Sequence, residues 1–276
     1  MYKSHQEELL KCTELNGSSC FNTSILEADF TNTDFLTVHY LSSHLTNGDK
    51  VLLVSLHHPF SHLSAIADKA GTNLLSHFKL GNLKVIEGLR LMREAASLSA
   101  NCKELEQHPF SFIYGQKTLK NLFLLIKQLV TEWQCNNSEF TIIIDKLCTL
   151  INFNINTCEF KRFIAYCNSL LVSNDEQGVD NLQRKCGCLI ISSSACSTDV
   201  HYEDLKHLLT NYFDVTVSLE GLSTGRSSKV DGRMRVIRWP VLKRIDPCSV
   251  ELFHYKLSEK GVNLFAPGMA SSLLSE

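Results

Sequence analysis

The sequence predicts an α/β fold in which a mostly parallel sheet is flanked by helices and ends in antiparallel strands. Short apolar runs such as "KVLLVSL" and "FTIIID" lack polar alternation, which is typical of strands covered on both faces. Such runs alternate with helical patterns as far as about residue 211, the order expected when crossover helices join parallel strands. The last part of the chain has strand patterns with no helix between them, which indicates hairpins at one edge of the sheet.

Each element follows from local patterns. The first strand is expected at residues 23–28, and the next helix begins at Thr33 or Asp34 and ends at Asn47-Gly48. A helix at residues 59–71 has Ser61 as its expected cap. Further strands are expected at residues 50–56, 83–88, 139–145 and 187–192, and further helices at residues 89–100, 115–133, 157–172 and 199–213. The C-terminal strands are expected at residues 214–220, 232–239, 250–257 and 261–266.

Length, composition and charge limit the classes of protein to which this chain can belong. The chain has 276 residues, 44% of them hydrophobic, and no linker rich in proline or glycine divides it, so we expect one domain over residues 21–276 after a flexible leader, residues 1–20. The net charge of -2 gives no global attraction to nucleic acid or membrane. No apolar stretch approaches the ~20 residues that a membrane span requires, and the leader lacks a secretory pattern. The expected location is therefore the cytoplasm, with the nucleus as a second compartment.

Two close pairs raise the question of a metal site. Cys186 and Cys188 lie on one face of an expected strand, but no second ligand pair accompanies them, so we interpret them as strand cysteines. His57 and His58 are adjacent at the end of a strand and point in different directions, so we expect them to be hydrogen-bonded or exposed to solvent. With no secretory signal, the eleven cysteines are expected to be free thiols.

An alternating core closed by antiparallel strands is a RecA-like layout. Such domains bind nucleotide with a phosphate loop after the first strand, where glycines admit the phosphates and a lysine neutralises their charge. Here the loop at residues 29–34 has no glycine and no lysine, and it has two aspartates. Thr31, Thr33 and Asp145, which ends the strand "FTIIID", are the expected remnants of a degenerate nucleotide site. We expect Asp145 to cap the next turn, and we expect no catalytic residue, cofactor or metal.

A basic segment is the other candidate site. It contains Arg226, Lys229, Arg233, Arg235, Arg238, Lys243 and Arg244 against one acid, Asp231. Alternation in "RMRVIRW" places Met234 and Val236 on one face of a strand and Arg233 and Arg235 on the other. Charge alone favours a solvated edge strand, and the alternative is a contact with the phosphates of a nucleic acid. The proposed contact residues are Arg226, Lys229, Arg233, Arg235 and Arg238.

Several stretches together resemble the family of the sixth subunit of the Elongator complex. They are "FLTVHYLSSHLTNGDKVLLVSLHHPFSHLSAIADKAG", "GNLKVIEGL", "VSLEGLSTG" with "DGRMRVIRW", and "HYKLSEKGVNLFAPGM". They follow the order of the family and cover roughly residues 25 to 270. The segments "PFSH", "EGLSTG" and "FAPGM" match best.

The resemblance implies a RecA-like subunit without ATPase motifs. It implies a heterohexameric ring with Elongator subunits four and five, which joins the larger Elongator subunits, binds tRNA and supports carboxymethyl-type modification of wobble uridine. It also makes the basic segment a reasonable tRNA contact. Two other hypotheses remain: an active nucleotide hydrolase with a divergent loop, and a regulatory RecA-like paralogue such as a recombination mediator.

Overall fold

The computed structural model describes residues 21–28, 31–98, 102–136, 138–172, 187–194, 199–222, 227, 229–239, 248–258 and 261–267. The expected leader, residues 1–20, lies outside the described residues. The described strands form one sheet in the order β3-β2-β4-β5-β1-β6-β7-β8-β9. They are β1 (Thr23–Glu27), β2 (Lys50–Ser55), β3 (Leu83–Glu87), β4 (Phe140–Asp145), β5 (Gly187–Ser194), β6 (Val215–Glu220), β7 (Gly232–Arg238), β8 (Ser249–Ser258) and β9 (Gly261–Phe265).

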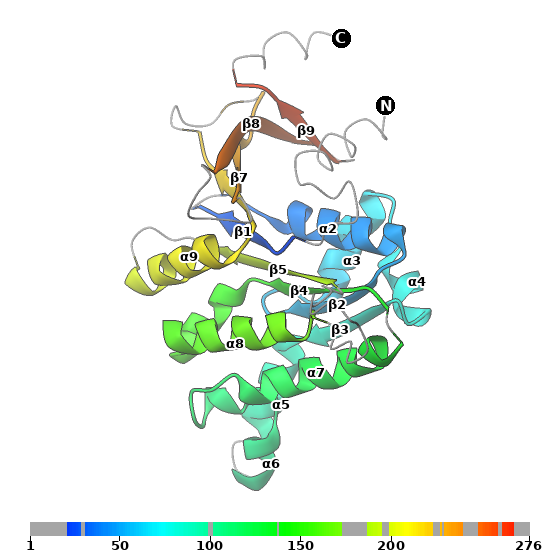
Figure 1. Ribbon diagram of the computed structural model, residues 1–276, viewed down its shortest axis with the longest axis vertical. Coiled ribbons are helices and arrows are strands. Elements are labelled where there is room, and N and C mark those ends of the chain that lie inside the picture. Colours follow the sequence, from blue (N-terminus) through cyan, green and yellow to red (C-terminus); the bar gives the residue numbers. More distant parts are fainter. Residues whose placement is uncertain are drawn as a thin grey trace, which may run out of the picture.

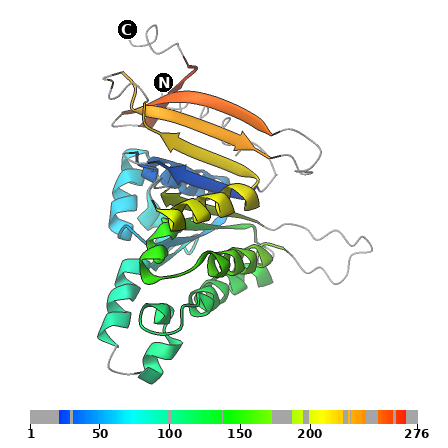
Figure 2. The same cartoon turned by 90° about the vertical axis from the view of Figure 1, so that its left-hand side faces the viewer.

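The sheet has a parallel part and an antiparallel edge, as the sequence predicts. The strands from β3 to β6 in the sheet order are all parallel, whereas β7, β8 and β9 pair antiparallel (Figure 2). Residues 214–220 were expected to belong to the hairpins, and β6 does pair antiparallel with β7, but its other neighbour in the sheet is β1. β6 follows a crossover helix and pairs parallel with β1, so the antiparallel edge begins at β7.

Helices cover both faces of the sheet (Figure 1). One face carries α2 (Asp34–Asn47), α3 (Phe60–Lys69) and α4 (Leu74–Lys79). The other carries α5 (Gly88–Ser97), α6 (Cys102–Gln107), α7 (Lys120–Cys135), α8 (Thr157–Ser169) and α9 (Val200–Tyr212), with the 3₁₀ turns η1 (Ser111–Ile113) and η2 (Leu147–Phe153). Among the described helices, none is both long and apolar enough to cross a membrane.

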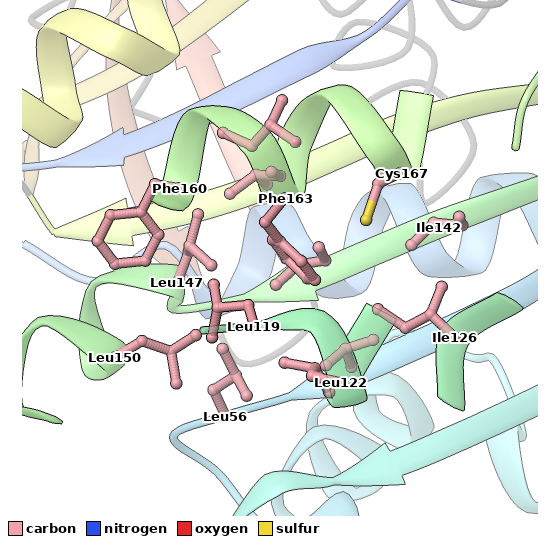
Figure 3. Packing of buried hydrophobic residues seen from close by; sticks show 14 of the residues in the cluster. Leu56, Leu119, Leu122, Ile126, Ile142, Leu147, Leu150, Phe160, Phe163 and Cys167 are labelled. Atoms are coloured by element: carbon pink, nitrogen blue, oxygen red, sulfur yellow. The ribbon is translucent and has the colours of Figure 1, made fainter. Parts of the chain in front are cut away.

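The larger apolar core lies between the sheet and α5–α9. Phe160, Phe163 and Cys167 of α8 point toward the sheet, and Ile142 of β4 lies beside Cys167 (Figure 3). Successive side chains of a strand point to opposite faces of the sheet. Ile143 therefore packs in the second apolar core, on the α2 side. This double coverage explains why the parallel strands are apolar without alternation.

The ends of α2 and α3 test the helix caps that the sequence predicts. Thr33 is the N-cap of α2 as expected, but its side chain makes no cap hydrogen bond, and Gly48 ends the helix with φ 91°. The N-cap of α3 is Pro59, so the expectation that Ser61 caps this helix is wrong. α2 is buried on most sides because the edge strands also pack on it, with the Phe35 and Tyr255 rings 5.7 Å apart.

Candidate functional site

The carboxyl ends of β1, β4 and β5 lie next to one another in the sheet, and buried polar side chains gather there. The chain leaves β1 toward α2 on one face, and leaves β4 and β5 toward α8 and α9 on the other. A divergence of this kind is where open α/β sheets usually bind ligands. We call these side chains the polar cluster, and its members are Glu27, Thr33, Asp145, Lys146, Ser192 and Ser194.

An ion pair between Lys146 and Glu27 is the centre of the polar cluster. Lys146 follows β4 in a left-handed conformation, with φ 58°, and its Nζ pairs with the Glu27 carboxylate and donates to Thr33 Oγ1 at 2.9 Å. Glu27 also accepts hydrogen bonds from Thr33 N and Thr33 Oγ1, both at 3.0 Å, and from Ser194 Oγ at 2.7 Å. The pair therefore joins β1, β4, β5 and the loop before α2.

The ion pair also sets the charge state of Glu27. Burial acts to raise the pKa of this carboxyl, but the Lys146 ammonium and the hydrogen bonds from Lys146, Ser194 and Thr33 outweigh it, so the pKa is lowered. Glu27 is thus ionised at neutral pH, and it neutralises the Lys146 ammonium.

Asp145 lies fully buried beside this pair. Its Oδ1 accepts hydrogen bonds from Ser192 Oγ at 2.8 Å and from Thr37 Oγ1 at 3.3 Å, and burial raises its pKa. Its Oδ2 is buried with no hydrogen-bond partner among the described residues. The carboxylate therefore contacts side chains of α2 and β5, instead of capping the next turn as expected from the sequence.

The structure brings together two of the three expected remnants of a nucleotide site. Thr33 and Asp145 both belong to the polar cluster, Thr33 through its contact with Lys146 Nζ and Asp145 through its contact with Ser192. Thr31 lies outside the polar cluster, because its hydroxyl donates to the Ala28 carbonyl at 2.8 Å in a local turn. The Lys146–Glu27 pair was missed. An acid that ends one parallel strand and a lysine that follows another were the only signal for it.

The basic strand β7 has the predicted alternation. Met234 and Val236 are fully buried, whereas the Arg233 and Arg235 side chains are 42% and 45% exposed. Both arginines lie near Glu220 of β6, with N–O distances of 3.4 Å and 3.6 Å. One acid thus faces two arginines, and this face of β7 keeps a positive excess.

The other expected basic residues divide into three groups. Lys229 is exposed shortly before β7. Arg226 lies outside the described residues, as do Lys243 and Arg244. Arg238 is on the Met234 and Val236 side of the strand, only 14% exposed, and its Nη1 pairs with Glu251 at 3.0 Å. Strand alternation therefore separates Arg238 from the face that carries Arg233 and Arg235.

The two close pairs considered as metal ligands have different surroundings. Cys186 lies outside the described residues, and Cys188 is buried with its Sγ 3.4 Å from Thr141 Oγ1 and 3.6 Å from His44 Nε2. His57 is exposed. His58 approaches Asp34, with 3.3 Å between His58 Nε2 and Asp34 Oδ2, a contact between distant positions that sequence spacing could not predict.

Comparison with known proteins gives the family. A model of the family described as "Elongation complex protein 6" matches residues 7–259, which is most of the chain. The chain belongs to this family. Relatives named Elongator complex protein 6 include that of Xenopus tropicalis, 28% identical over 252 residues, and that of Homo sapiens, 25% identical over 250 residues. Each of these alignments covers 88% of this chain and 90% of the relative.

Both candidate regions lie within the part that matches the Elongation complex protein 6 family. The polar cluster spans Glu27 to Ser194, and β7 ends at Arg238, so each falls inside residues 7–259. The "FAPGM" segment, which contributed to the resemblance in sequence, lies beyond the end of that match.

Proposed function

We propose that this chain is a non-catalytic structural subunit of an Elongator complex. It forms a heterohexameric RecA-like ring with subunits four and five, and the ring supports tRNA binding and carboxymethyl-type modification of wobble uridine. The observation that carries the proposal is membership of the Elongation complex protein 6 family over residues 7–259, with relatives named as Elongator subunits.

The polar cluster supports a non-catalytic role. A RecA-like ATPase needs a free lysine and backbone N–H groups for the phosphates, and an acid that organises magnesium. Here Lys146 is paired with Glu27, and α2 begins with the buried acid Asp34. A triphosphate placed at the carboxyl ends of these strands would meet both carboxylates and would have to break the ion pair.

Calorimetry with ATP and magnesium on the isolated full-length chain tests this part. We expect no heat of binding. The hypothesis of an active hydrolase requires the opposite, namely ATP binding with a turnover that Asp145→Asn abolishes, and that result would overturn the non-catalytic assignment.

Co-expression with subunits four and five tests the ring. We expect the three chains to purify together, with a native mass that corresponds to two copies of each. A chain that stays monomeric in the presence of both partners would contradict the proposal.

The exposed face of β7 is the proposed tRNA contact, now limited to Arg233 and Arg235 with Lys229 beside the strand. Arginine side chains that are nearly half exposed can reach phosphates, and a polyanion competes with the single acid that faces them, Glu220. Arg238 is no longer part of this surface, because it is mostly buried and paired with Glu251.

Reversing Arg233 and Arg235 to glutamate tests this contact in the assembled ring. We expect weaker tRNA binding and a shallower dependence of log K on log salt, by roughly 0.7–0.9 for each phosphate that is no longer neutralised. Lys120→Glu with Lys127→Glu is the matched control, because it changes charge equally at two exposed positions of α7 on the other side of the molecule. Equal binding by both double variants would remove β7 from the tRNA surface.

A further inference from the structure

Three side chains of metal-ligand type converge beside the polar cluster. Asp34 is the first residue of α2, His58 lies in the connection after β2, and His62 is in the first turn of α3. Asp34 Oδ2 is 3.3 Å from His58 Nε2 and 3.2 Å from His62 Nε2. One potential ligand atom from each of the three residues lies within 4.8 Å of the other two.

The two histidine rings approach the same carboxylate oxygen from neighbouring positions. Their centroids are 4.4 Å apart and the rings are stacked, with an interplanar angle of 28°. If both rings were protonated, their positive charges would repel each other at this separation. If both were neutral, only hydrogen bonds would hold the three side chains together. A metal ion would hold the three side chains together without this repulsion, because two neutral imidazoles and one carboxylate can all bind it at once.

Buried carboxylate oxygens supply a second, independent observation. Asp34 is almost fully buried, and its Oδ1 has no hydrogen-bond partner among the described residues. Oδ2 of the fully buried Asp145 has none either. Such groups are rare in folded proteins, and a bound ion is one of the explanations for them. With Glu27, these two aspartates place three carboxylates around the polar cluster, where Lys146 pairs with Glu27.

We propose that Asp34, His58 and His62 bind a divalent transition-metal ion of the zinc type. Two imidazole nitrogens and one carboxylate oxygen are a common ligand set for zinc, whereas magnesium and calcium prefer oxygen ligands alone. A tetrahedral ion with bonds of about 2.1 Å has ligand atoms roughly 3.4 Å apart. The two distances to Asp34 Oδ2, 3.2 Å and 3.3 Å, are close to this value.

The bound ion would join three connected parts of the fold. It would tie the start of α2 to the β2–α3 connection and to α3, and it would place a positive charge near Asp145. The half-exposed His62 leaves the site open toward solvent, so a water can complete the ligand set. The proposal does not depend on the chain's role in a ring or in tRNA binding.

Zinc and cobalt binding to the full-length chain test the site. The chain is prepared without a histidine tag and freed of metal with a chelator, and Zn²⁺ is then followed by calorimetry and by elemental analysis after dialysis. We expect one equivalent to depend on this site, and a higher melting temperature with Zn²⁺. His58→Gln and His62→Gln should each weaken zinc binding by about 100-fold or more, since even outer partners of metal ligands contribute about 10–100-fold.

His57→Gln is the matched control, because His57 is adjacent and exposed but is not one of the three converging residues. It should bind Zn²⁺ as the wild type does. Co²⁺ separates this site from the cysteines, since thiolate ligands give an intense charge-transfer absorption that nitrogen and oxygen ligands do not. No bound zinc would overturn the proposal. So would binding that survives His58→Gln with His62→Gln, or a cobalt spectrum with thiolate character that these variants leave unchanged.

Discussion

Replacing Lys146 by methionine tests whether its buried ion pair with Glu27 stabilises the fold. Methionine keeps the length of the side chain and removes its charge, so the Glu27 carboxylate loses its cation. The two side chains are 6% and 13% exposed, so water cannot fully replace the ammonium. Lys146 has a left-handed backbone conformation, and methionine meets the same steric limits there as lysine does. The substitution therefore adds no new backbone strain.

The size of the effect follows from what remains around Glu27. Removing one partner of a buried ion pair typically costs about 3–5 kcal/mol. Glu27 would still accept three hydrogen bonds from Thr33 and Ser194, which places the loss at the lower end, about 3 kcal/mol. For a chain of this size that corresponds to a melting temperature lowered by about 6–12 °C.

Urea unfolding of the full-length chain measures this loss. The double variant Glu27→Gln with Lys146→Met should be more stable than Lys146→Met alone, because no unpaired charge is left buried. Lys206→Met is the control, since Lys206 pairs with Glu203 on the surface of α9 and should change stability by less than about 0.5 kcal/mol. A loss below about 1 kcal/mol in Lys146→Met, similar to a surface pair, would refute the reasoning.

The pH dependence of the same variant follows from the lowered pKa of Glu27. A carboxyl whose folded pKa lies below its ordinary value of 4.5 contributes stability above that value, and the contribution is lost as the pH falls through the folded pKa. The difference between wild type and Lys146→Met should therefore shrink in acid. A difference that stays constant down to the acid transition would argue against an ionic origin.

Three further predictions concern other buried positions. Gly187→Ala should destabilise the chain by about 3 kcal/mol in urea unfolding, because the new Cβ would lie 1.8 Å from the Phe140 carbonyl oxygen. An unchanged urea midpoint of unfolding would contradict the close approach of β4 and β5. Burial raises the pKa of Asp145, so the contribution of this carboxyl to stability is lost as the pH rises above the ordinary value of 3.8. Asp145→Asn should therefore gain stability relative to the wild type over that range in metal-free buffer, and parallel stability curves would oppose this. Burial, with His44 nearby, lowers the pKa of His39 to about 3, so its contribution is present above the ordinary value of 6.5 and is lost toward about pH 3, and His39→Leu should flatten that acid decline.

The sequence predicted most of the sheet, because continuous apolar runs and helical stripes are local signals. β2 and β4 were predicted from continuous apolar runs, in which alternate residues pack in the two different cores. The parallel pairing of β6 with β1 was missed, since the apolar pattern of a strand does not show which distant strand it pairs with. The short helices α4 and α6, six residues each, were missed because they have too few turns to show periodicity.

The candidate site was less predictable, because its contacts join distant parts of the chain. Thr33 and Asp145 were identified from their places after parallel strands, where ligand sites usually form. Glu27 meets Lys146 across 119 positions, and Asp34 meets His62 across 28. Neither pair has a characteristic spacing. Alternation placed Arg233 and Arg235 correctly on one face of β7, and the same rule, had it been extended to Arg238, would have placed that residue on the other face.

The most direct test of the proposed function is the modification of wobble uridine in cells that lack this chain. Mass spectrometry of tRNA nucleosides measures the carboxymethyl-type derivatives before and after the wild-type chain is restored. We expect the derivatives to be lost without the chain and to return with it. Normal levels of these derivatives in cells without the chain would contradict its assignment as an Elongator subunit that supports tRNA modification.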